Sequence, residues 1–168
     1  MRDLFKNLKD EQLHTTSSFA RGEVLPVTQV PIKEFSQKKW EDGYGLLISR
    51  GETDIYSPAD GIVKEISKNG NEYRIITDDG LDIQIHLGVD TDRLDQSYFA
   101  VCCSPGQKVK RGEKIGSLDL ERIYKKCICP VSYLVFLSGE EVRLRKHHAM
   151  VGPGDTDFFW CAQTEKLI

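Results

Sequence analysis

Apolar and polar residues alternate strictly along residues 81–89. Positions 81, 83, 85, 87 and 89 are apolar, whereas positions 82, 84 and 86 are polar. A period of two is typical of a β-strand with one face on a core and the other face in solvent. The pattern therefore predicts a strand over Leu81–Gly88 and places His86 on its solvent-facing side, in register with Asp82 and Gln84.

Short apolar runs separated by turn residues fill most of the remaining chain and predict further strands. The predicted strands are Glu23–Val27, Gly45–Ser49, Asp54–Ser57, Ile62–Ser67, Glu72–Thr77, Leu81–Gly88, Phe99–Cys103, Lys114–Leu118, Val131–Leu137, Val142–Lys146 and Asp157–Ala162. The strongest hairpin signal is Asp79-Gly80, between the fifth and sixth of them. Only Leu118–Lys126 is rich in helix formers. The expected fold is all-β, a compact antiparallel sandwich or flattened barrel with at most one or two short helices.

The first 21 residues differ from the rest because they are charged and carry few apolar side chains. They predict a mobile or weakly amphipathic tail, 1–21, that could rest on a membrane surface. The polar stretch Thr15–Ser18 is typical of the edge of a folded body. Short strands begin after Gly22, so residues 22–168 are expected to form a single domain.

Composition narrows the classes of function. A chain of 168 residues suits one domain, and a net charge of −3 without a basic stripe argues against nucleic-acid binding. No run approaches the roughly 18 apolar residues of a membrane span, and no secretory segment is seen. The 5 cysteines, an odd number, favour reduced thiols in a cytoplasm. Because they lack the C-x₂-C spacing of structural zinc sites, no metal or cofactor is expected.

His86 is the first candidate for chemistry, because a neutral imidazole nitrogen is a competent nucleophile near neutral pH. A surface histidine without a role remains the alternative at this point. The adjacent pair His147-His148 is expected on the surface, since neighbouring strand residues point to opposite faces and cannot easily bind one ion.

A series of sequence words resembles one known family and occurs in the same order over about 140 of the 168 residues. The words are Gly22–Val27, Val30-Pro31, Phe35–Gly43, Ser57–Gly61, Asp79–Thr91, Gly106–Gly112, Leu118–Leu120 and Pro130-Val131. They resemble enzyme IIA of the glucose class in the bacterial phosphoenolpyruvate-dependent sugar phosphotransferase system. The fold of that family is a compact antiparallel β-sandwich, which agrees with the strand pattern.

The resemblance implies a phosphoryl carrier, that is, a phosphotransferase component with a phosphohistidine intermediate. His86 would accept a phosphoryl group from the phosphocarrier protein HPr and pass it to the IIB domain of a membrane sugar transporter. The carbonyl of Gly88 would orient the ring through Nδ1, which leaves Nε2 as the acceptor. Asp90 would support the site, although a cap at the end of the strand is the alternative for this residue.

Asn71 departs from the family pattern. Glucose-class members usually carry a second histidine fifteen residues before the phosphorylated one, and Asn71 takes that place here. An asparagine amide can donate a hydrogen bond to a phosphoryl oxygen but cannot become cationic. We therefore expect that His86 can be phosphorylated and that onward transfer is slower. A turn residue at the hairpin tip is the alternative for Asn71.

A rim around the histidine is where the family docks its partners. The residues at the matching positions are Phe35, Lys39, Trp40, Ser67, Tyr73 and Gln84. The aromatic members keep bulk that a partner can contact, whereas the polar ones replace apolar residues and leave the partner's identity open.

Two further classes of function are alternatives to the carrier. A non-catalytic or sensory IIA-like module is favoured by Asn71 and by the polar rim, and it remains open. A zinc peptidase is disfavoured because no H-x-H motif accompanies His86. The expected partners are HPr and a IIB domain, without nucleic acid, and membrane contact is expected only indirectly or through the tail.

Overall fold

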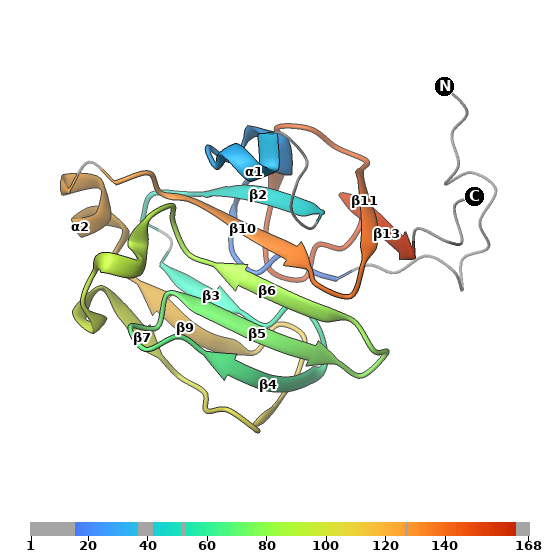
Figure 1. Cartoon of the computed structure of the whole chain (residues 1–168), viewed down its shortest axis with the longest axis horizontal. Coiled ribbons are helices and arrows are strands. Elements are labelled where there is room, and N and C mark those ends of the chain that lie inside the picture. The colour runs from blue at the N-terminus through green and yellow to red at the C-terminus, as the bar shows by residue number, and fades with distance from the viewer. Residues whose placement is uncertain (1–15, 37–41, 52, 127, 164–168) are drawn as a thin grey trace.

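The computed structural model describes residues 16–36, 42–51, 53–126 and 128–163, and in them antiparallel strands dominate (Figure 1). One sheet has 8 strands in the order β12-β1-β2-β10-β6-β5-β4-β8. Their bounds are β12 Met150–Val151, β1 Gly22–Pro26, β2 Gly43–Ile48, β10 Val131–Phe136, β6 Asp82–His86, β5 Glu72–Thr77, β4 Gly61–Ile66 and β8 Lys108–Val109.

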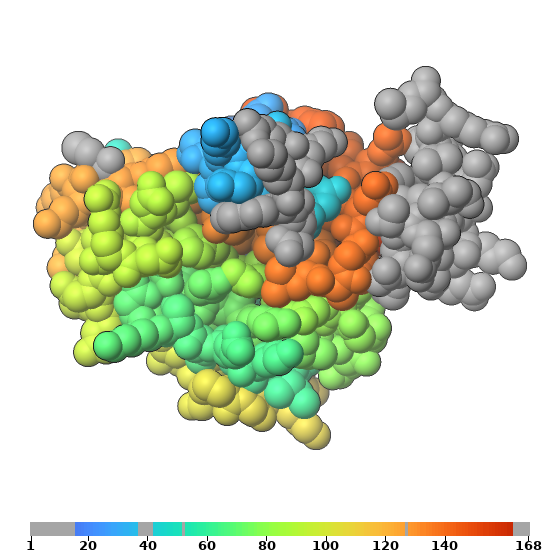
Figure 2. Space-filling model, in the orientation of Figure 1, coloured from blue at the N-terminus to red at the C-terminus, as the bar shows by residue number. Residues whose placement is uncertain are grey.

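Two smaller sheets and a few short helical segments complete the described part of the fold. A sheet of 3 strands has the order β3-β9-β7 and lies behind the large sheet in Figure 1, and 2 further strands pair as β11-β13. The bounds are β3 Asp54–Tyr56, β9 Lys114–Leu118, β7 Phe99–Val101, β11 Glu140–Leu144 and β13 Phe159–Gln163. The helices are α1 Lys33–Ser36 and α2 Leu120–Lys125, with 3₁₀ turns η3 Val27–Gln29, η4 Thr91–Arg93 and η5 Gln96–Tyr98.

The predicted all-β sandwich is confirmed. Each predicted strand has an observed counterpart, and Glu72–Thr77 and Lys114–Leu118 agree at both ends. The helix within Leu118–Lys126 is α2, where the Asp119 side chain accepts a hydrogen bond from the backbone N–H of Arg122 as an N-cap. Strands β8 and β12 have two residues each, too few to produce a period-two pattern, and were not predicted.

The hairpin of β5 and β6 holds the candidate histidine. Its register pairs Ile76 with Asp82 and Glu72 with His86, and Gly80 in the connecting turn has a φ of 90°. A left-handed residue is what this turn requires, and glycine adopts it without steric cost. Strand β10 pairs with the other edge of β6, so His86 lies between two neighbours in the sheet.

The main core lies between the large sheet and the three-stranded sheet. Ile83 and Ile85 of β6 are fully buried there, together with Ile55 of β3 and Ile115 of β9. A second, smaller cluster covers the outer face of the large sheet beneath η3 and α1. Its members are Val27, Val30, Phe35, Val89, Tyr133 and Val135. The η3–α1 segment, light blue in Figure 2, therefore shields part of the face on which His86 lies.

The folded body starts earlier than the predicted boundary at Gly22. Residues 16–20 are buried, with at most 1% of each exposed. The N–H of Ser17 donates to the carbonyl of Pro58 at 2.8 Å, and the N–H of Tyr56 donates to the carbonyl of Phe19 at 2.8 Å. The expected tail thus ends before these residues, and residues 1–15 lie outside the described part. No helix of the described ranges is long and apolar enough to cross a membrane.

We expect the large sheet to depend on the core face of β6. Ile85→Ala should lower the free energy of unfolding by about 2 to 5 kcal/mol, because it removes a fully buried side chain and leaves a cavity. Urea denaturation followed by circular dichroism measures this loss. Ile62→Ala in β4 is the matched control, because Ile62 is 43% exposed and its loss should cost well under half as much. Equal losses in the two variants would contradict this view of the core.

Candidate functional site

His86 is the last residue of β6, and its side chain points away from the main core. The face was predicted correctly, since Ile83 and Ile85 face the core while His86 faces the other way. The predicted exposure was wrong, because only 9% of the side chain is accessible to solvent. Neighbours from two other segments cover the ring, and a period-two pattern carries no information about such neighbours.

Tyr133 of β10 covers one face of the imidazole. The two residues are partners across the strands, and their rings stack with centroids 5.0 Å apart and planes 12° from parallel. Phe35 of α1 makes an edge contact with the Tyr133 ring, with centroids 5.0 Å apart and planes at 79°. Burial, with the nearby carboxylates, raises the pKa of Tyr133 well above its usual value, so this tyrosine stays uncharged. The imidazole thus lies on a fixed, neutral aromatic surface.

Two carboxylates flank the ring, one near each nitrogen. Oε2 of Glu72 lies 3.8 Å from Nδ1 of His86, and Oδ1 of Asp92 lies 4.0 Å from Nε2. Glu72 is the cross-strand partner of His86 on β5, whereas Asp92 comes from η4, after the end of β6. The Glu72 side chain is 31% exposed and that of Asp92 is 76% exposed, so the Asp92 carboxylate is much the freer to move.

Asn71 is fully buried, and its hydrogen bonds are already in use. Its Oδ1 accepts from the hydroxyl of Ser67 at 2.6 Å. Its Nδ2 donates to Oγ1 of Thr91 at 3.0 Å and to Oδ1 of Asp92 at 2.7 Å. The amide thus points toward the space beside Nε2 of His86, as the resemblance implies, but a carboxylate occupies its second hydrogen.

The hairpin tip uses a different asparagine. Nδ2 of Asn69 donates to the carbonyls of Thr91 and Leu94, at 3.0 and 2.9 Å. These bonds fix the loop after β6 to the turn before β5. The alternative role of Asn71, a simple turn residue, does not account for its side-chain bonds to Thr91 and Asp92.

Gly88 shapes the loop after β6. Its φ is +76°, and a Cβ there would lie 2.6 Å from Cγ2 of Thr91, so only glycine fits. Its N–H donates to the buried hydroxyl of Ser132 at 3.0 Å. Within the described ranges the His86 ring makes no hydrogen bond to the Gly88 carbonyl, and its nearest charged neighbours are the two carboxylates.

Asp90 is exposed and has a φ of 60° directly before η4. Its side chain makes no capping hydrogen bond to that turn. Aspartate is among the few residues that tolerate the left-handed conformation, and this accounts for its presence here. In this loop, the acidic side chain near the imidazole is that of Asp92, two residues further on.

The predicted docking rim is only partly where it was expected. Tyr73 is fully buried on the core face of β5, next in the chain to Glu72 but on the opposite side of the sheet, so it offers no surface to a partner. Phe35 is 2% exposed because it packs under Tyr133. Gln84 is half-buried and, with Ser67, lines a hollow of about 230 Å³ beside Glu72. Lys39 and Trp40 lie outside the described residues.

A larger hollow of about 530 Å³ lies beside Asn71 and Asp92. It is lined by Ser67, Lys68, Asn69, Asn71, Asp92, Leu94, Asp95 and Gln96. Sequence reasoning missed Glu72, Asp92 and Tyr133 as neighbours of His86. The register of the β5–β6 hairpin could have identified Glu72, whereas Tyr133 required knowledge that β10 pairs with β6.

The imidazole and the two carboxylates beside it are also groups of the kinds that bind metal ions. Glu72, His86 and Asp92 each offer a ligand atom, and these atoms lie within 4.8 Å of one another. The carboxylates face different nitrogens of one ring, however, so an ion bound at either nitrogen would lie closer to one carboxylate than to the other. The arrangement is better suited to holding the ring and its protons than to a closed metal site.

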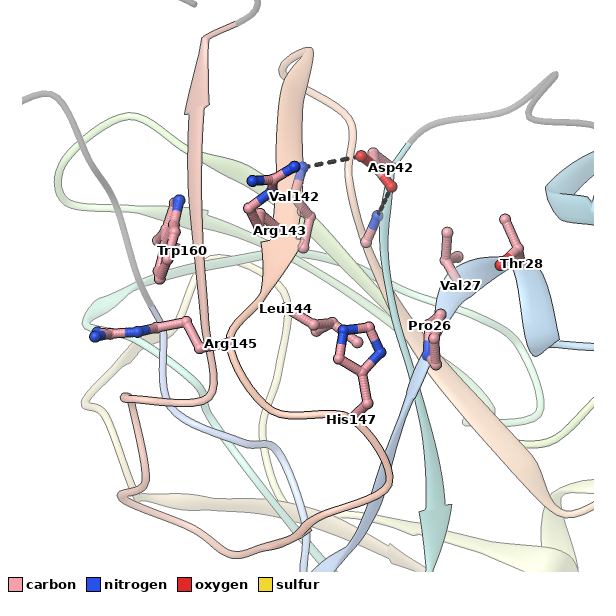
Figure 3. A pocket seen from close by; sticks show the side chains of 11 residues that line it. Pro26, Val27, Thr28, Asp42, Val142, Arg143, Leu144, Arg145, His147 and Trp160 are labelled. Carbon is pink, nitrogen blue, oxygen red and sulfur yellow. Dashed lines mark hydrogen bonds between the residues drawn. The ribbon is translucent and has the colours of Figure 1, made fainter. Parts of the chain in front are cut away.

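Another hollow, of about 600 Å³, lies away from His86 between β11, β13 and the start of η3 (Figure 3). Arg143, Arg145 and His147 give it a basic lining, and the guanidinium of Arg145 lies 4.8 Å from the centre of the Trp160 ring. His147 and His148 are exposed, as predicted, but they lie in a bend and not in a strand. Nδ1 of His148 lies 3.2 Å from Oε2 of Glu23.

The described cysteines, Cys102, Cys103, Cys129 and Cys161, are free thiols. Burial raises the pKa of Cys103 to about 11 and that of Cys161 further, so these two thiols stay protonated and unreactive.

Comparison with known proteins identifies the family of the chain and a solved structure with the same fold. A family model described as phosphoenolpyruvate-dependent sugar phosphotransferase system, EIIA 1, matches residues 14–142. Among solved structures, the glucose permease IIA from Mycoplasma capricolum superimposes with a TM-score of 0.75 at 22% identity, over 88% of this chain and 95% of that chain. The structural likeness establishes the fold. The family match spans well over half of the sequence, so this chain belongs to the EIIA family of the phosphoenolpyruvate-dependent sugar phosphotransferase system and is a phosphoryl carrier of that system.

Proposed function

We propose that His86 is the phosphoryl acceptor, that it is loaded by phospho-HPr, and that it passes the phosphoryl group to a IIB domain. The observation that carries this proposal is the environment of the ring. Its face is fixed on Tyr133, Glu72 lies beside Nδ1, and a hydrogen-bond donor, Asn71, points to the space beside Nε2. These are the positioning elements that transfer between two proteins requires.

The reaction needs little beyond this geometry. The lone pair of unprotonated Nε2 attacks phosphorus, a P–N bond forms, and the P–N bond to the donor histidine breaks. In onward transfer a nucleophile of the IIB domain attacks the same phosphorus, and the electron pair returns to Nε2. Little free energy is lost, because the bond that breaks and the bond that forms in loading are of the same kind.

Glu72 supplies what the resemblance assigned to the Gly88 carbonyl. Its carboxylate lies 3.8 Å from Nδ1, so a small side-chain movement makes it the acceptor for the N–H at that nitrogen. A proton held at Nδ1 leaves Nε2 with its lone pair, which is the tautomer that accepts a phosphoryl group. Gly88 then acts through the conformation of the loop and its bond to Ser132.

His86→Ala should abolish labelling by phosphoenolpyruvate, enzyme I and HPr. Intact-mass spectrometry measures the gain of one acid-labile, base-stable phosphoryl group in the unsubstituted protein and its loss in the variant. His147→Ala is the matched control, because His147 is exposed and lines a different hollow. Full labelling of the His86→Ala protein would rule out His86 as the acceptor, and failure of the unsubstituted protein to be labelled would favour a sensory module.

Glu72→Gln should slow loading of His86 by about tenfold, since an amide is a weaker acceptor for the N–H at Nδ1 and about 1.4 kcal/mol corresponds to a factor of ten. Stopped-flow or quench-flow labelling by phospho-HPr gives the rate. Glu65→Gln is the control, because Glu65 is a more exposed carboxylate, on β4, that pairs with Arg74. Equal rates for Glu72→Gln and the unsubstituted protein would remove Glu72 from the mechanism.

Asn71→His should speed onward transfer to a IIB domain by roughly tenfold, because a cationic donor makes a charge-assisted hydrogen bond about twice as strong as a neutral one. Single-turnover transfer from the preloaded protein is the measurement. The variant's urea denaturation curve must match that of the parent, since Asn71 is fully buried. A folded variant that transfers no faster would show that Asn71 does not limit the step.

A further inference from the structure

We propose that Asp92 is a positioning residue that controls loading of His86. Its carboxylate occupies the place beside Nε2 that the phosphoryl group would take, and it moves away when the histidine is phosphorylated. The inference rests on the proposed function of His86 and adds a residue to it. One oxygen of Asp92 carries the argument, because it lies 2.7 Å from Nδ2 of Asn71 and 4.0 Å from Nε2 of His86.

This oxygen occupies the space that a phosphoryl group on Nε2 would need. A transferred phosphoryl group brings three anionic oxygens beside Nε2, and they require hydrogen-bond donors. The amide of Asn71 has two N–H donors, one bonded to Thr91 and the other to Asp92. The bond to Asp92 is the one available for exchange, and like charges at this separation repel each other.

The Asp92 side chain can leave while its surroundings stay in place. It is 76% exposed, and side chains of this kind change rotamer on a picosecond to nanosecond timescale. The preceding backbone is fixed, since the Thr91 hydroxyl donates to the carbonyl of Leu87 at 2.6 Å and Asn69 donates to the carbonyl of Thr91 at 3.0 Å. The exchange therefore requires rotation of one side chain and no movement of the sheet.

Asn71 also stays in place during the exchange. Ser67 continues to donate to its Oδ1 at 2.6 Å, and its Nδ2 continues to donate to Thr91 at 3.0 Å. Only the acceptor of its second hydrogen changes, from a carboxylate oxygen to a phosphoryl oxygen. The displaced carboxylate turns into solvent, to which 76% of the Asp92 side chain is already exposed.

The two carboxylates beside the ring should therefore have opposite effects. Glu72 lies on the Nδ1 side, where it helps the nucleophile, whereas Asp92 lies on the Nε2 side, where it competes with the incoming group. A general effect of negative charge on loading would give both substitutions the same sign. The difference in sign separates a local role from a change in net charge.

The test compares loading rates of Asp92→Asn, Glu72→Gln, Asp95→Asn and the unsubstituted protein. Two donors are used, phospho-HPr and the small molecule phosphoramidate, because the small donor removes any effect of Asp92 on protein docking. We expect Asp92→Asn to load about fivefold to tenfold faster with both donors, whereas Glu72→Gln loads more slowly. Asp95→Asn, on the same loop and with the same change in charge, should stay within twofold, since asparagine also accepts the capping hydrogen bond from Ser97.

Each outcome decides the inference. If the unsubstituted protein is labelled at His86 and Asp92→Asn is no faster, the role of Asp92 is refuted while the function of His86 stands. A gain with phospho-HPr alone refutes it too, because Asp92 would then act in docking. If neither the unsubstituted protein nor the Asp92→Asn variant is labelled, both the proposed function and this inference are refuted. Labelling of Asp92→Asn alone supports a carboxylate that blocks the phosphoryl position.

Discussion

The arrangement around His86 depends on the hydrogen bonds that the buried side chain of Asn71 makes. Through Thr91 and Asp92 it joins the start of β5 to the loop that follows β6, and Ser67 fixes it from the other side. A buried amide without partners costs free energy, so these bonds hold the loop in one conformation. The position of the carboxylate near Nε2 therefore follows from how the amide is satisfied.

The ring itself is held by a different principle, which is aromatic contact on the outer face of a sheet. A sandwich normally leaves that face to solvent, and His86 would then have several rotamers. Here Tyr133 stacks on the imidazole and in turn packs against Phe35, so the small outer cluster extends to the His86 ring. This packing explains why so little of the His86 side chain is exposed to solvent.

The sequence was informative wherever a local pattern decides the structure. The β5–β6 hairpin and the core-facing side of Ile83 and Ile85 follow from strict alternation and an Asp-Gly turn. The low exposure of His86 could not be predicted, because Tyr133, which covers one face of the ring, comes from β10, and no local rule states that β10 pairs with β6. The resemblance to the family placed Tyr73 on the docking rim, whereas the alternation in β5 puts this residue in the core.

The molecule has two hydrophobic clusters, and the smaller outer one should open locally at a lower free energy than the main core. It is small, and η3 and α1 cover it with only a few residues. Segments with so few buried contacts open at a lower free energy than a sandwich core. Transient lifting of η3 and α1 would remove the packing of Phe35 against Tyr133 and leave the Tyr133 ring freer to rotate beside the imidazole, while every sheet stayed intact. Amide hydrogen exchange in that segment would therefore report on how firmly the aromatic surface beside His86 is held.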